Sequence, residues 1–277
     1  MEKSQERLAV LEKITEYEKN GWFDKDVEND PPGRQIQPGE VDYLRKKLSS
    51  KIKTRYAYFL ARKFYNKILR EGIMVIDGIE GLENFAGLKS GAVVTCNHFN
   101  AMDSFALQYL YEASKHKKRK FYKVIKEGNY TSFPGFYGQL MRNCYTLPLS
   151  SNTQTLKEFV TAVNTLLRRG NFVLVYPEQS MWWNYRKPKP LKRSAFKFAA
   201  ENDVPVLPVF ITMRDTDNLD NDGFPVQAYT IHVGKPIYRD VDLSDMENAE
   251  NMKKRNYEVW KEIYEKVYGI PLEYERK

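Results

Sequence analysis

The sequence predicts an α/β fold in which helices cover both faces of a mostly buried central sheet. From residue 72 onward, short apolar runs alternate with longer stretches of helical periodicity. The runs are nearly continuous in apolar residues, as in strands that are buried on both faces, and their alternation with helices is typical of a layered α/β domain. We therefore predict one main domain at 72–240, flanked by a helical arm at 1–71 and a helical extension at 241–277.

The N-terminal arm begins with a predicted amphipathic helix over residues 2–19. Its apolar residues recur every three positions, at Leu8, Leu11, Ile14 and Tyr17. Prolines and glycines follow between Pro31 and Gly39, and they predict a loop or an extended arm. Residues 1–42 carry eleven acidic and six basic side chains, so this first part of the arm is acidic.

A second, basic helix is predicted over residues 43–70, with Asp42 as its N-cap. This segment carries ten Lys or Arg residues and no acid. Its apolar residues recur mostly at steps of four: Leu44, Leu48, Ile52, Phe59, Leu60, Phe64 and Ile68. Two interpretations stay open, namely a helix packed on the core with a solvated basic face, or a helix lying on anionic lipid.

The domain itself contains six predicted strands and three predicted helices, followed by a charged terminal helix over 248–268. The strands are IMVI (73–76), AVVTC (92–96), FYKVI (121–125), NFVLVY (171–176), VPVLPVFI (204–211) and YTIHVG (229–234). The helices between them are 103–114, 153–169 and 191–201.

The bulk composition limits the possible environments and partners. The net charge of +8 favours a polyanionic partner such as nucleic acid or anionic lipid, but no recognised nucleic-acid-binding motif accompanies the charge. Two cysteines provide neither a disulfide framework nor a zinc spacing. Because no run of about 18 apolar residues is present and the N-terminus lacks a signal-peptide pattern, we predict a cytoplasmic protein held peripherally on the inner face of a membrane.

His98 and Asp103 are the strongest candidates for chemistry. His98 follows a buried-type strand directly, in TCNHFNAMDSFAL, and Asp103 opens the next predicted helix. Loops after strand ends are where α/β folds present reactive side chains. From there Asp103 could fix the tautomer of His98 and make it a general base for a hydroxyl. The alternative is a plain helix cap beside an ordinary loop histidine. No second His or Cys cluster argues for a metal, so none is predicted.

NHFNAMD (97–103) resembles the NHxxxxD motif of the glycerolipid acyltransferases, the family of the 1-acyl-glycerol-3-phosphate acyltransferases. Similar segments follow the family's order across roughly residues 73–238. They are VIDGIEGL (75–82), KVIKE (123–127), VYPEQS (175–180, usually FPEGTRS), VPVLPVFI (204–211) and HVGKPI (232–237).

The resemblance implies that His98 takes the proton of an acceptor hydroxyl, which attacks the thioester of acyl-CoA or acyl-carrier protein, while Asp103 orients His98. No covalent acyl-enzyme, metal or cofactor is implied. It also implies substrate-binding roles for Asn97, Lys126, Glu178, Gln179 and Ser180. Lysophosphatidic acid is the leading acceptor, at an anionic membrane surface.

Two departures from the family pattern leave the acceptor open. The arginine of the third motif is absent, and Ser150 stands where the second motif has one. Lys192 and Arg193, near a predicted helix start, could bind a phosphate instead, or they could form a solvated basic face. A non-phosphorylated lipid or polyol is therefore an alternative acceptor, and a non-catalytic basic membrane-binding module is the alternative from another functional class.

Overall fold

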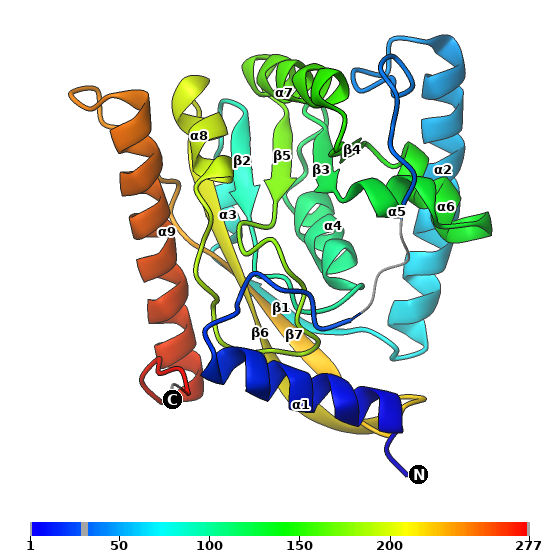
Figure 1. Ribbon diagram of the computed structural model, residues 1–277, viewed down its shortest axis with the longest axis vertical. Coiled ribbons are helices and arrows are strands. Elements are labelled where there is room, and N and C mark those ends of the chain that lie inside the picture. Colours follow the sequence, from blue (N-terminus) through cyan, green and yellow to red (C-terminus); the bar gives the residue numbers. More distant parts are fainter. Residues whose placement is uncertain (1, 29–32, 276–277) are drawn as a thin grey trace.

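A seven-stranded sheet runs through the centre of the computed structural model, which describes residues 2–28 and 33–275 (Figure 1). The strand order is β1-β7-β6-β2-β5-β3-β4. Only the β6–β7 pair is antiparallel; the other neighbours are parallel. The strands are β1 (Val75–Glu80), β2 (Ala92–Thr95), β3 (Phe121–Ile125), β4 (Thr146–Pro148), β5 (Phe172–Val175), β6 (Val206–Leu219) and β7 (Pro225–Val233).

Helices connect the strands and extend the chain at both ends. They are α1 (Gln5–Lys19), α2 (Leu48–Arg70), α3 (Leu82–Ala86), α4 (Asp103–Ala113), α5 (Glu127–Thr131), α6 (Gly135–Asn143), α7 (Thr153–Arg168), α8 (Ser194–Glu201) and α9 (Asp245–Tyr268). Among the described residues, no helix has the length and apolarity needed to cross a membrane.

Apolar side chains fill both faces of the sheet. Along β2, Val94 packs in a cluster that includes residues of α3 and α4, whereas Val93 packs in a second cluster with residues of α7, α8 and α9. Successive side chains of a strand point to opposite faces, so a strand covered on both sides must be apolar throughout, and all four residues of β2 are buried. The predicted α/β fold with a central sheet and flanking helices is confirmed.

The arm covers the segment that follows β5. Val10 and Ile14 of α1 pack with Trp182 and Trp183 in a separate apolar cluster, and the Trp182 indole N–H donates to the carbonyl of Lys25. In Figure 1, α1 lies across the sheet end from which the 177–193 segment emerges. The predicted N-terminal helix is present, and it serves to pack against this segment. Pro31 and Pro32, part of the predicted loop, lie outside the described residues.

Several predicted boundaries are wrong. The basic helix begins at Leu48, not at residue 43, and its N-cap is Lys47. Asp42 instead accepts the backbone N–H groups of Lys46 and Lys47 in the preceding turn. The first strand starts two residues late, at Val75, because exposed Ile73 still belongs to the connection after α2. The helix predicted from residue 191 begins at Ser194.

Candidate active site

His98 and Asp103 meet beyond the carboxyl end of β2. The His98 Nδ1–H donates to Asp103 Oδ2 at 2.6 Å. The Asp103 side chain is 2% exposed and the His98 side chain 23% exposed, so the imidazole lies between the buried carboxylate and the surface. Asp103 is the first residue of α4, which explains how a spacing of five brings the two side chains together. The sequence predicted this pair, and the structure forms it.

Asn97 anchors the loop that carries His98. Its side-chain amide donates to the Ile211 carbonyl at 3.0 Å, and its oxygen accepts the Ile211 N–H at 2.8 Å. Asn97 therefore continues the β2–β6 pairing beyond the end of β2, and it is buried. The structure places this predicted substrate-binding residue where it holds the backbone of the loop.

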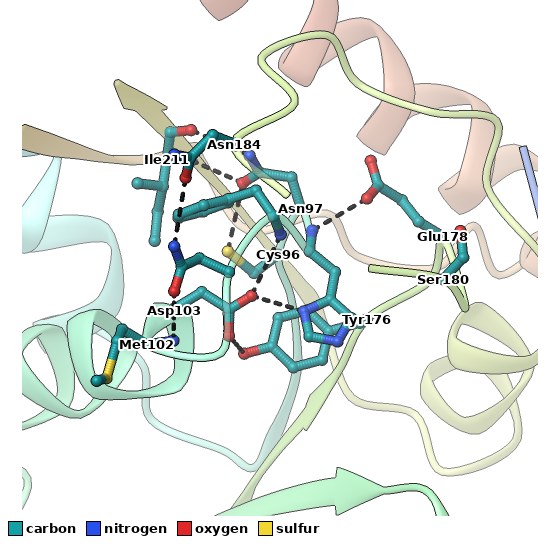
Figure 2. A network of polar contacts seen from close by, with 12 residues as sticks. Cys96, Asn97, Met102, Asp103, Tyr176, Glu178, Ser180, Asn184 and Ile211 are labelled. Carbon is teal, nitrogen blue, oxygen red and sulfur yellow. Dashed lines mark hydrogen bonds and ion pairs between the residues drawn. The ribbon is translucent and has the colours of Figure 1, made fainter. Parts of the chain in front are cut away.

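Tyr176 lies against both members of the pair, and sequence reasoning missed it. Its hydroxyl donates to Asp103 Oδ1 at 2.6 Å. Its ring stacks on the His98 imidazole, with centroids 4.1 Å apart and planes 17° apart. Figure 2 shows Tyr176 and Asp103 side by side beneath the loop that begins at Cys96. Burial raises the pKa of the Tyr176 hydroxyl well above its ordinary value. No local pattern marks Tyr176, because its side chain contacts His98 and Asp103, which are distant in sequence.

Glu178 lies just beyond β5 and is buried. Its Oε2 accepts the backbone N–H of His98 at 3.0 Å, and its Oε1 accepts that of Lys189 at 2.8 Å. The Lys189 Nζ lies 3.7 Å from Oε2, and the two side chains are 2% and 1% exposed. Burial raises the pKa of Glu178 and lowers that of Lys189 to about 8, while the pair's attraction opposes both changes.

Gln179 and Ser180 make contacts within the protein. Gln179 has a positive φ of 63°, and its side-chain amide donates to the Ser194 hydroxyl at 3.3 Å. The Ser180 hydroxyl donates to the Phe23 carbonyl at 2.6 Å and accepts from Lys189 Nζ at 2.8 Å. Ser180 is buried. The structure thus uses Ser180 to join the arm to the segment after β5, while Gln179 stays exposed beside α8.

The cations predicted to bind substrate all have carboxylate partners. Lys126 Nζ lies 2.7 Å from Asp26 and Lys192 Nζ lies 3.0 Å from Asp24, so the arm supplies both acids. Arg193 instead lies 3.6 Å from Glu250 of α9. The structure therefore brings Lys126 and Lys192 to the arm and separates Arg193 from them.

The second motif also has an acidic neighbour. The Ser150 hydroxyl, which stands where the resemblance expects an arginine, donates to Glu127 Oε1 at 2.6 Å. Nearby in the sequence, Arg142 donates to the carbonyls of Tyr130 and Phe133.

Comparisons with known proteins indicate a family and a fold for this chain. Residues 76–212 match the sequence model of the family described as Acyltransferase, a range that includes His98, Asp103, Tyr176 and Glu178. The crystal structure of the 1-acyl-sn-glycerophosphate (LPA) acyltransferase PlsC from Thermotoga maritima has a similar fold, with a TM-score of 0.56. The two chains are 18% identical, and the match covers 97% of each. None of the curated protein sequences compared matches this chain.

Proposed function

Because this chain belongs to the acyltransferase family through residues 76–212, we propose that it transfers a fatty acyl group from a thioester to a hydroxyl of a lysophospholipid. The donor is acyl-CoA or acyl-carrier protein. The observation that carries the proposal is the 2.6 Å contact between His98 Nδ1 and Asp103. Family membership makes the chain an enzyme, which removes the non-catalytic membrane module from the alternatives.

The contact assigns each nitrogen of His98 a role. Asp103 accepts the Nδ1–H, so the neutral imidazole keeps its lone pair on Nε2. Among the described residues, none forms a hydrogen bond with that Nε2, and the side chain is partly exposed. Nε2 is thus free to accept the proton of an acceptor hydroxyl, and buried Asp103 stabilises the imidazolium that results.

In the proposed reaction, His98 carries the proton from the acceptor to the leaving group. The acceptor oxygen attacks the thioester carbonyl carbon while its proton passes to Nε2. The resulting tetrahedral intermediate collapses as the carbon–sulfur bond breaks, and Nε2 returns the proton to the departing thiolate. The products are an ester and a free thiol.

Lysophosphatidic acid is the leading acceptor in this proposal, because Lys126 directly follows β3 and the backbone N–H of Lys192 donates to the carbonyl of Pro177, just beyond β5. Each is paired with an aspartate of the arm, and both side chains of each pair are well exposed. Exposed pairs contribute about 0–1 kcal/mol, whereas a hydrogen bond to a charged group contributes about 1.5–3 kcal/mol. A phosphate can therefore displace the aspartates.

A non-phosphorylated lipid or polyol is the second candidate acceptor. It is favoured by the same two aspartates, which already neutralise the lysines, and by Ser150, which contacts Glu127 where the resemblance expects an arginine. An uncharged headgroup would leave both ion pairs in place.

We place the reaction at a membrane surface because α2 exposes an apolar stripe among basic residues. Leu48, Ile52, Tyr56 and Phe59 are 55–73% exposed and recur at steps of four, four and three. A monomeric soluble protein rarely leaves such a row uncovered. Together with the basic residues of α2, it has the composition of a helix that lies in an anionic interface.

The catalytic assignment is tested with purified His98→Ala, assayed with an acyl thioester and lysophosphatidic acid. Thiol release and ester formation are both measured. Loss of the general base should lower kcat about 10²–10⁴-fold, and Asp103→Asn should also be severely impaired. His116→Ala is the matched control, because His116 contacts Phe85 away from the site. Wild-type turnover by His98→Ala would refute the assignment.

A further inference from the structure

We propose that Tyr176 is a positioning residue that sets the orientation and charge distribution of the His98–Asp103 pair. The inference rests on the proposed role of His98 as general base. Three contacts carry it: the 2.6 Å hydrogen bond from the Tyr176 hydroxyl to Asp103, the 2.6 Å contact between Asp103 and His98, and the stacking of the tyrosine ring on the imidazole.

The Tyr176 hydroxyl and the His98 imidazole bind different oxygens of the Asp103 carboxylate. Oδ1 accepts from Tyr176, while Oδ2 accepts from His98 Nδ1 and, at 3.4 Å, from the backbone N–H of Phe99. A carboxylate that is rotated by 90° about its axis would lose both strong bonds. Tyr176 therefore holds the plane of Asp103 so that Oδ2 points at Nδ1.

The hydroxyl also stabilises a charge that has little other support. Asp103 is almost fully buried, and within the described residues it forms no ion pair with a lysine or arginine. A buried carboxylate needs hydrogen-bond donors to remain charged. Burial raises the pKa of Tyr176 well above its ordinary value, so the phenol keeps its proton and acts as a donor.

The ring restrains the imidazole in a second direction. Asp103 holds the edge of His98 at Nδ1, and Tyr176 covers one face at a centroid distance of 4.1 Å. An edge contact alone leaves the imidazole free to tilt about the hydrogen bond. The two contacts together direct Nε2 toward the open side of the site.

The pairing of β5 with β2 fixes the position of Tyr176. β2 and β5 are parallel neighbours, with Thr95 opposite Val175, so Tyr176 is the first residue beyond β5 on the strand next to the His98 loop. Pro177 follows it, and a proline keeps the preceding residue extended. The side chain of Tyr176 consequently enters the site from the sheet.

Two variants separate the hydroxyl from the ring. Tyr176→Phe keeps the stacking and loses the bond to Asp103, whereas Tyr176→Leu loses both. We expect Tyr176→Phe to lower kcat about ten- to a hundredfold, as for a lost hydrogen bond to a charged group, with KM for both substrates unchanged. Tyr176→Leu should be lower still. Tyr43→Phe is the matched control, because the buried Tyr43 hydroxyl donates to the Pro148 carbonyl away from the site.

The pH profile of kcat/KM provides a readout that a merely structural role would not move. Removing the phenol leaves Asp103 a stronger base, which favours the protonated imidazole, so the acid limb of Tyr176→Phe should move to higher pH. Site-specific 3,5-difluorotyrosine at position 176 keeps the shape and strengthens the donor, so it should move the limb to lower pH. It also serves if Tyr176→Phe fails to fold. The other ionisable groups around the pair are Glu178 with its partner Lys189, Cys96 and Tyr229, and they are unchanged in every variant.

The outcomes distinguish this inference from the function on which it rests. If His98→Ala retains turnover, the proposed function fails regardless of position 176. If His98→Ala is inactive but Tyr176→Phe matches Tyr43→Phe in kcat and in its acid limb, only the role of Tyr176 is overturned. A shift of the acid limb in the same direction for phenylalanine and difluorotyrosine would also overturn it.

Discussion

The carboxylate of Glu178 accepts the backbone N–H of His98 at 3.0 Å, so the loop that carries the candidate base is held by a residue 80 positions later. The same carboxylate binds the backbone N–H of Lys189 and lies 3.7 Å from its ammonium. Glu178 therefore acts as a buried hub that joins the loop after β2 to the segment after β5.

Replacing Glu178 should destabilise the protein as well as reduce its activity. Glu178→Ala leaves the Lys189 charge and two backbone donors buried without their acceptor, and breaking a buried pair costs about 3–5 kcal/mol. Urea unfolding measures this loss in the free energy of unfolding. Glu250→Ala is the control, because it breaks two pairs at the protein surface, with Arg193 and with Lys253, and each should cost less than about 1 kcal/mol. Equal effects of the two variants would contradict the hub.

The arm aspartates should control discrimination between acceptors. If a phosphate binds Lys192 and Lys126, the double variant Asp24→Asn/Asp26→Asn should lower KM for lysophosphatidic acid, because two competing carboxylates are removed. Lys192→Ala should raise that KM about ten- to a hundredfold. KM for monoacylglycerol should change in neither variant. Steady-state kinetics with both acceptors measure the contrast.

The control for the arm is Asp77→Asn, which removes an exposed partner of Arg214 away from the arm. If Asp24→Asn/Asp26→Asn and Lys192→Ala treat both acceptors as the wild type and Asp77→Asn do, the phosphate site is wrong. The non-phosphorylated acceptor then becomes the better candidate.

The apolar stripe of α2 should be required for binding to anionic vesicles. Ile52→Glu/Phe59→Glu places two charges in this stripe. Burial of each apolar side chain in the vesicle contributes about 1.5–3 kcal/mol, so binding should fall at least tenfold. Co-sedimentation with anionic liposomes measures it, and the wild-type signal should also fall with added salt.

Val241→Glu is the control for the stripe, because Val241 is an even more exposed apolar residue but precedes α9, which lies across the molecule from α2 in Figure 1. It should bind as the wild type does. Equal wild-type binding to neutral and anionic vesicles at low salt would mean that the basic residues of α2 do not contribute.

Gln179 should be a site of backbone strain. Its φ of 63° lies in the left-handed region, which costs a residue with a Cβ about 1–2 kcal/mol, and the family motif has glycine at this position. Gln179→Gly should therefore raise the free energy of unfolding, by about 0.5–1 kcal/mol after the greater freedom of unfolded glycine is subtracted. Thermal or urea unfolding tests this. Gln179→Ala keeps the strain, and a stabilisation equal to that of glycine would disprove this explanation.

The fold class was predictable because strands buried on both faces are apolar along nearly their whole length, as β2 and β5 are. Elements too short to show a period escaped prediction. β4 has three residues, and α3 and α5 have five each, fewer than two helical turns. The start of α2 was misplaced because apolar Leu44 continues the helical spacing into the turn before Leu48.

The sequence by itself indicated the His98–Asp103 pair, because a strand end, a short loop and a helix start bring residues five apart close together. Tertiary structure alone decided the rest of the site. The parallel register that sets Thr95 opposite Val175 places Tyr176 and Glu178 beside a loop from which they are far apart in sequence. Folding of the arm against the segment after β5 likewise gives Lys192 and Lys126 their aspartate partners. Hydrogen bonds and ion pairs depend on distance in space, and for these residues only the packed sheet and the arm supply it.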